Sequence, residues 1–394
     1  MFDKFDWNLV FLKKSPFDLT PPTDPEQIVW TGMKQVKRRF DEIFEVAFSD
    51  STTQVVLNQG PWGGGKTHAS LYFKNKKNLP QTLTDTDTEH FFPINVCVPK
   101  EPGNPAEDIY TDILDILGMR DVQRIIRDAI GNLSEDEALD LLHKFLSSEE
   151  LARAFWLCGT QEDNERQALL RSYFFEGVTR TDLRKLGIAR NITKSQDRFR
   201  VLAGVLQCII GIDRRCESFR PTRVCLWIDE IEDLIYLSSA QFRIVSQGLR
   251  DMIDRLPNNF TLFLNMTLSD PEEYEDLETI LGGALLNRIT DFIYFPELEL
   301  NEAVEYVSEI INHHQYRDEP LPKELPQTYP FEPKALEMLL DGLEIKTPRE
   351  INKRCRNVIN FAFRDNRFPR DGEGIIDPTY VKTIENSELD REIV

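Results

Sequence analysis

A phosphate-binding loop motif constrains this chain more than any other feature of its sequence. Residues 60–67 read Gly-Pro-Trp-Gly-Gly-Gly-Lys-Thr and fit the pattern G-x-x-x-x-G-K-[ST]. The apolar run 53–58 before the motif predicts a strand, and residues 68–74 after it predict a helix. A strand, a glycine-rich loop and a helix, in this order, are the context in which the motif binds phosphate. The alternative is an incidental glycine turn beside a lysine, and the flanking elements argue against it.

The residue types of the motif suit a nucleoside triphosphate, such as ATP, together with Mg²⁺. Successive glycines let backbone N–H groups approach the phosphates, because no Cβ stands in the way. The helix after the loop directs its positive dipole end at the same anion. We expect the Lys66 ammonium to reach the β- and γ-phosphates and the Thr67 hydroxyl to bind Mg²⁺. The expected nucleotide-binding residues are Gly60, Pro61, Trp62, Gly63, Gly64, Gly65, Lys66, Thr67 and His68.

Two adjacent carboxylates follow another apolar run and predict the hydrolytic part of the site. Residues 224–228 are continuously apolar, which is typical of a parallel strand covered on both faces, and Asp229 and Glu230 come directly after them. Ligand sites of parallel sheets lie at the carboxyl ends of the strands. We expect Asp229 to hold the Mg²⁺ shell and Glu230 to activate the attacking water. The alternative is an acidic first turn of a helix, and the upstream phosphate loop favours the catalytic interpretation.

The rest of the pattern predicts a wound α/β core with helical additions. Three more apolar runs predict the other strands of the sheet: 91–98, 260–267 and 291–296. Residues 1–50 form a proline-punctuated lead-in and an amphipathic helix, which pack beside the nucleotide base or serve as a simple packing arm. We expect residues 51–299 to form the core, with a helical insertion at 119–208. A helical lid at 300–365 and a short charged tail at 366–394 complete the prediction.

Composition and charge exclude several classes of protein. The formal net charge of −20 argues against a surface coat of DNA-binding charge, although a local basic groove remains compatible with it. No apolar run is long enough to cross a bilayer and residues 1–6 lack a signal-peptide pattern, so we expect a cytoplasmic protein with no membrane partner. The cysteines lack C-x-x-C spacing, which favours buried free thiols over disulfides or a zinc site.

Residues 180–200 are locally basic in an otherwise acidic chain. Arginine and lysine outnumber aspartate in this segment, and smaller basic clusters occur at 37–39 and 353–356. Such clusters can contact DNA or a partner protein. The alternative is a solvated surface whose charges pair with the chain's own carboxylates. The sequence therefore leaves DNA open as a direct partner.

The motifs together resemble the AAA+ ATPases over about residues 17–363. The phosphate loop and the Asp229-Glu230 pair carry most of the resemblance, and the Thr-Pro-Arg-Glu-Ile-Asn start of a helix at 347–352 adds to it. The resemblance implies an α/β P-loop core of the ASCE type with a five-stranded parallel sheet. It also implies a helical insertion and a C-terminal α-helical lid.

The resemblance further implies roles for residues outside the two central motifs. Asn265 or Thr267 matches sensor 1, which helps to place the water. Arg288 matches an arginine finger that acts on a neighbouring subunit, and Arg349 matches sensor 2, which reaches the γ-phosphate from the lid. Asn95 matches a residue that restrains the catalytic glutamate.

Two branches of the AAA+ family are similar to this chain. The loop Gly-x-Trp-Gly-x-Gly-Lys-Thr and the lid resemble the branch near the origin-recognition initiators. The stretches 173–188 and 227–232 resemble ATP-binding proteins of prokaryotic defence islands, the BREX type among them. These resemblances imply an ATP-hydrolysing motor or switch that forms homo-oligomers with the ATP site at the subunit interface. It would act on DNA with other proteins of its system, and the second resemblance implies antiphage defence.

Two alternative functions remain in view. A replication initiator or loader would need a DNA-binding winged helix, and the segment after residue 363 is short for one. A nucleotide-gated scaffold with little turnover would not need the water-activating carboxylate of Glu230. These two arguments favour an ATPase that works with partner proteins.

Overall fold

The computed structural model describes residues 5–22, 24–98, 104–131, 133–211, 221–268, 274–368 and 374–384. Five strands form one parallel sheet in the order β2-β3-β4-β1-β5. The strands are β1 (Gln54–Gly60), β2 (Phe91–Cys97), β3 (Arg223–Asp229), β4 (Phe260–Thr267) and β5 (Asp291–Tyr294). This arrangement confirms the α/β core with a five-stranded parallel sheet that the sequence predicted.

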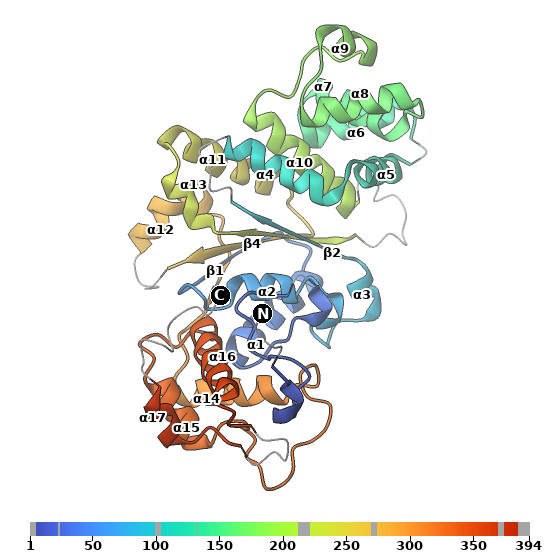
Figure 1. The fold of residues 1–394 in the computed structure, drawn as a ribbon. Helices are drawn as coiled ribbons and strands as arrows, with labels where there is room; N and C mark the ends of the chain where they lie inside the picture. Colours follow the sequence, from blue (N-terminus) through green and yellow to red (C-terminus); the bar gives the residue numbers. More distant parts are fainter. Residues whose placement is uncertain are drawn as a thin grey trace.

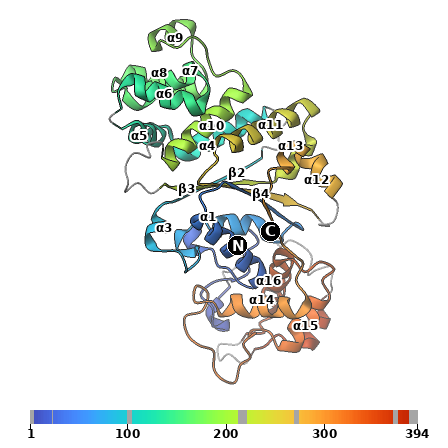
Figure 2. The ribbon, with the colours of Figure 1, turned by 180° about the vertical axis from the view of Figure 1, so that it is seen from behind.

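Helices cover both faces of the sheet (Figures 1 and 2). The covering helices are α1 (Lys34–Ser49) and α2 (Lys66–Tyr72) on one face, and α4 (Pro105–Leu117), α10 (Ser195–Ile210) and α11 (Ser239–Arg255) on the other. Successive strand residues point to opposite faces of the sheet. Val56 therefore packs on the side of α1, whereas Val55 and Leu57 pack on the side of α4, α10 and α11. On the α1 face, the ring of Phe40 contacts those of Trp227 and Phe263.

A helical insertion extends from the second face and ends far from the sheet, at α9 (Figure 1). Its helices are α5 (Met119–Ile130), α6 (Glu135–Leu146), α7 (Glu149–Thr160), α8 (Asn164–Phe175) and α9 (Arg180–Leu186). Leu142 and Phe155 are fully buried between these helices. Helix α10 joins the insertion to the sheet because it is apolar on most of its surface, with Leu202 and Val205 buried.

Part of the basic segment of the insertion is paired with carboxylates of the same chain. Arg190 and Arg200 bond to the buried carboxylate of Asp197 at 2.9 and 3.2 Å. Arg198 reaches Glu107 on α4 at 2.7 Å. These ion pairs favour the interpretation in which the segment neutralises the chain's own acidic groups.

The remaining elements of the lead-in and the core are short. They are η1 (Trp7–Val10), η2 (Pro25–Gln27), η3 (Lys76–Asn78), α3 (Asp85–Glu89), η4 (Ile231–Tyr236), α12 (Tyr274–Leu281) and α13 (Gly283–Leu286). Among the described residues, no helix is both long and apolar enough to cross a membrane.

A second, helical module lies on the other side of α1 and α2 from the sheet (Figure 1). Its helices are α14 (Leu300–Asn312), α15 (Pro333–Asp341), α16 (Pro348–Arg364) and α17 (Pro378–Thr383). The N-terminal lead-in packs on this lid, where Val10, Leu12 and Phe17 are buried in the same cluster as Ile351. The lead-in is therefore a packing arm of the lid.

Residues 374–384 belong to the lid, and the prediction that they form part of a charged tail was wrong. The Ile376 backbone N–H donates to the Pro330 carbonyl at 2.9 Å, and α17 buries Tyr380 and Val381 in the lid cluster. These few apolar side chains are too widely spaced to signal a core element on their own. They are buried because α15 offers them a complementary face. Residues 385–394 lie outside the described residues.

Candidate active site

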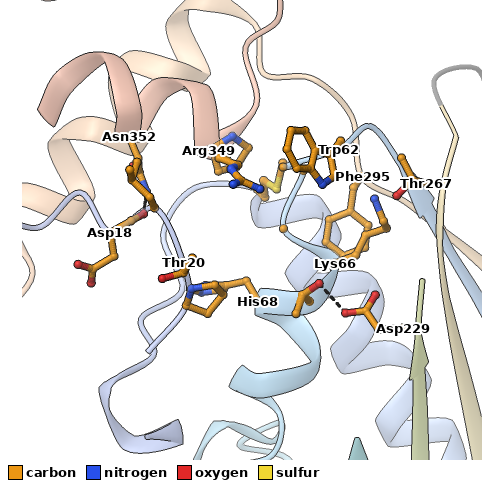
Figure 3. A pocket seen from close by; sticks show the side chains of 18 of the residues that line it. Asp18, Thr20, Trp62, Lys66, His68, Asp229, Thr267, Phe295, Arg349 and Asn352 are labelled. Carbon is orange, nitrogen blue, oxygen red and sulfur yellow. Dashed lines mark hydrogen bonds between the residues drawn. The ribbon is translucent and has the colours of Figure 1, made fainter. Parts of the chain in front are cut away.

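A cavity of about 660 Å³ opens at the carboxyl ends of the strands, between the core and the lid (Figure 3). The phosphate loop, Asp229 and Thr267 line its core side. Arg349 and Asn352 of α16 line the lid side, and residues 16–22 of the lead-in close it. The lead-in therefore packs on the lid and also lines the cavity.

The phosphate loop takes the conformation that its glycines permit. Gly65 has a φ of +108° and caps the start of α2, a backbone conformation that L side chains rarely adopt. The Lys66 ammonium is buried and donates to the carbonyl oxygens of Gly60 and Pro61 at 2.8 and 3.0 Å. Burial lowers the pKa of Lys66, and the negative charges of Glu232 and Asp229 oppose this shift. Lys66 therefore lines the cavity with its ammonium held by the carbonyl oxygens of the loop.

Thr67 and Asp229 meet at the floor of the cavity, although they lie far apart in sequence. The Thr67 hydroxyl donates to the Asp229 carboxylate at 2.5 Å (Figure 3). Desolvation raises the pKa of Asp229, whereas hydrogen bonds from Thr67 and from the Glu230 backbone N–H lower it. A hydroxyl and a single carboxylate beside a phosphate site form a donor set that suits Mg²⁺, which takes its other ligands from phosphate and water. The two residues fit the predicted metal site.

Glu230 directly follows β3 in a left-handed conformation with φ +57°. A non-glycine residue in this region carries strain, and such strain concentrates at functional sites. The Cys97 thiol donates to the Glu230 carboxylate at 2.9 Å. Asn95, which matched the restraining residue in the sequence, lies opposite Trp227, and its buried amide has no hydrogen-bond partner among the described residues. Cys97, two positions later on the same side of β2, makes the contact with Glu230 instead.

Asn265 and Thr267 lie at different depths at the end of β4. Thr267 lines the cavity, whereas Asn265 is fully buried beneath it. The Asn58 amide donates to Asn265 Oδ1 at 2.8 Å, because the two residues are opposite each other in the β1–β4 register. The Asn265 amide interacts with Asp229 and helps to oppose the rise in its pKa. Sequence reasoning missed Asn58, whose role depends on strand register.

Arg349 and His68 extend the site in different directions. The Arg349 guanidinium lies 4.2 Å from the ring centroid of Trp62, over the phosphate loop (Figure 3). The His68 ring lies against the lead-in, where its Nε2 is 2.8 Å from the carbonyl oxygen of Val29. Burial lowers the pKa of His68, so its imidazole is neutral at pH 7 and Nε2–H donates to that carbonyl. His68 thus anchors the lead-in to the loop.

Arg288 lies away from the cavity. It precedes the amino end of β5, whereas Phe295, just past the carboxyl end, lines the cavity beside the loop. Its guanidinium forms a two-pronged contact with Asp254, at 2.8 and 3.1 Å. Arg288 therefore cannot serve the phosphate site of its own chain in this structure.

A scan against protein-family models finds no match, and a search of curated protein sequences finds no relative. Solved structures do resemble the chain. The Aeropyrum pernix ORC2 protein in its ADPNP–ADP complexes matches 98% of this chain and 74% of its own, with 11% identity and a TM-score of 0.52. The ADP form of ORC2 matches 95% of this chain and 72% of its own, with 11% identity and a TM-score of 0.50.

A Walker-type ATPase of Pyrococcus abyssi, PABY2304, matches 90% of this chain and 73% of its own, with 13% identity and a TM-score of 0.43. At these identities the similarity is one of fold only. The statement of fold rests on the ORC2 structures, whose TM-scores are the higher ones. The overall fold is thus similar to that of the ORC2 structures. The chain is an α/β protein whose core has the AAA+ P-loop fold, similar to the fold of the two ORC2 structures.

Proposed function

We propose that the cavity binds ATP with Mg²⁺ and hydrolyses it. The 2.5 Å contact between Thr67 and Asp229 carries this proposal, because it joins two motifs that lie 162 residues apart in the sequence. Glu230 follows directly at the end of the same strand, so a water-activating carboxylate lies next to the metal-binding pair. The placement of these groups at one edge of a parallel sheet supports hydrolysis rather than binding alone.

Each residue of the cavity has a distinct task in this proposal. Lys66 binds the β- and γ-phosphates, and Thr67 with Asp229 holds the metal ion. When bound, Mg²⁺ neutralises charge on the phosphate oxygens. Glu230 takes the proton of the attacking water.

Residues around this centre support the reaction. Buried Asn265 is the better candidate for sensor 1, because its orientation is fixed by Asn58. Its Nδ2 lies on the side of Asp229 and helps to lower the pKa of that carboxyl. Arg349 completes the site from the lid.

The chain works as a homo-oligomer with the ATP site at the subunit interface. The remote position of Arg288 supports this part of the proposal, because a finger that cannot reach its own site can serve a neighbour's. The oligomer acts as a switch or motor together with other proteins of its system. A defence role rests on the sequence resemblance, whereas direct DNA binding has less support because Arg190, Arg198 and Arg200 are paired internally.

Nucleotide binding is tested with a matched pair of lysine variants. Lys66→Ala removes the ammonium that faces the phosphates, so we expect it to abolish binding of a fluorescent ATP analogue. Lys74→Ala removes an exposed lysine just past α2 and should bind like the wild type. Equal affinity of the two variants for ATP would overturn the assignment of the site.

A further inference from the structure

Trp62 projects from the phosphate loop, and the guanidinium of Arg349 from the lid lies over its indole ring. Its side chain is 68% exposed, although it belongs to the loop that holds phosphate. The Arg349 guanidinium carbon lies 4.2 Å from the centroid of its ring, within the range of a cation–π contact. An exposed indole stacked on a candidate catalytic arginine calls for an explanation beyond phosphate binding.

The backbones of the loop and the lid approach closely at the same place. A Cβ on Gly63 would lie 2.7 Å from the Arg349 Cβ and 3.1 Å from the Thr347 hydroxyl oxygen, so a larger residue does not fit. The Arg349 backbone N–H donates to the Gly63 carbonyl at 3.4 Å. Thr347 is fully buried and caps the start of α16. The fold itself, rather than one flexible side chain, therefore places Arg349 beside Trp62.

Stacking leaves the N–H donors of Arg349 free for an anion. A guanidinium is planar, so a contact through its face keeps its N–H edge available for two-pronged binding of phosphate. Across the described residues, the Arg349 side chain has no hydrogen bond or ion pair. Arg349 and Lys66 line the same cavity (Figure 3), so the free edge and the ammonium can meet one triphosphate.

We propose that Trp62 is the positioning residue for Arg349. The indole face holds the guanidinium over the cavity with its N–H edge ready for the γ-phosphate, and it couples the lid to the loop. This inference rests on the proposed function, because it assigns Trp62 to the same ATP site. The opposite arrangement, in which the stack withholds Arg349 from the nucleotide, predicts the reverse effect of removing the indole.

The test is a double-mutant cycle with a conservative control. We measure ATP and ADP affinity and the turnover number for Trp62→Ala, Trp62→Phe, Arg349→Ala and the double alanine variant. Trp62→Ala should weaken ATP affinity or turnover by about 2- to 30-fold, the range of a cation–π contact. ADP affinity should hardly change, because ADP lacks the γ-phosphate. Trp62→Phe should recover most of the loss, since phenyl also stacks with a guanidinium.

The double variant should be no worse than Arg349→Ala, because Trp62 acts only through that arginine. Three results would overturn the inference and leave the ATPase proposal intact. They are additive effects of the two alanine substitutions, an equal loss of affinity for ADP and for ATP, and a Trp62→Phe variant as impaired as Trp62→Ala. A gain of activity in Trp62→Ala would also overturn it, in favour of a withheld arginine. A wild-type protein that binds no nucleotide would overturn both proposals.

Discussion

At the scale of residues, the site depends on polar groups that lie at the ends of neighbouring strands. Asn58 donates to Asn265 Oδ1, which leaves Asn265 Nδ2 on the side of Asp229. The opposite amide orientation would direct the Asn265 oxygen at the Asp229 carboxylate, and two acceptors would face each other. The sheet thus fixes which end of the Asn265 amide faces the Asp229 carboxylate.

The ionised carboxylate that Asp229 needs for its proposed function should lower the stability of the folded chain. Desolvation raises its pKa, so the folded chain disfavours the carboxylate, and the ionised form costs stability at neutral pH. Asp229→Asn keeps an acceptor for Thr67 and cannot ionise. We expect it to raise the melting temperature at pH 7 without Mg²⁺ by a few degrees, measured by differential scanning fluorimetry.

The stabilisation by Asp229→Asn should depend on pH. The cost of ionised Asp229 disappears as the pH falls through its raised pKa, so the gain from Asp229→Asn should shrink toward acidic pH. Added Mg²⁺ should stabilise the wild type and leave Asp229→Asn unchanged. A variant that is less stable than the wild type at every pH would show that the carboxylate is not the destabilised group.

At the scale of elements, the sequence predicts most of the core because its strands are continuous apolar runs covered on both faces. The phosphate loop, Asp229 and Glu230 were also predictable, since each is a local motif. Contacts between motifs were not. The bond from Cys97 to Glu230 requires the β2–β3 register, and the stack of Arg349 on Trp62 requires the position of the lid. The lid helix α17 was missed because its short apolar pattern has meaning only against α15.

At the scale of the whole molecule, the cavity and Arg288 occupy opposite ends of the sheet. The carboxyl ends of the strands face the lid, whereas Arg288 precedes β5 and pairs with Asp254 of α11. The insertion extends from one face of the sheet and the lid lies beyond the other (Figure 2). The cavity and Arg288 therefore lie apart on the molecule.

Subunit mixing tests whether Arg288 serves a neighbouring site. An arginine finger supplied by another subunit is worth about 10³–10⁵ in rate. We expect the specific ATPase activity to rise with protein concentration, and mixtures of Arg288→Ala and Lys66→Ala subunits to recover part of the lost activity. Mixtures of Lys66→Ala with Glu230→Gln provide the control, because both defects lie in the same site. No recovery at any ratio of the first mixture would argue for a site contained in one chain.

The fate of bound ATP in Glu230→Gln tests the central claim most directly. The amide cannot take the proton of the attacking water, so the variant should bind ATP as tightly as the wild type and retain it unhydrolysed. The exposed Glu297 provides a matched control, and Glu297→Gln should hydrolyse ATP normally. The measurement is a quenched single-turnover assay with radiolabelled ATP and Mg²⁺, in which wild type and Glu297→Gln form ADP and phosphate while Glu230→Gln does not. Conversion of ATP by Glu230→Gln at the wild-type rate would contradict the assignment of this cavity as the hydrolytic site.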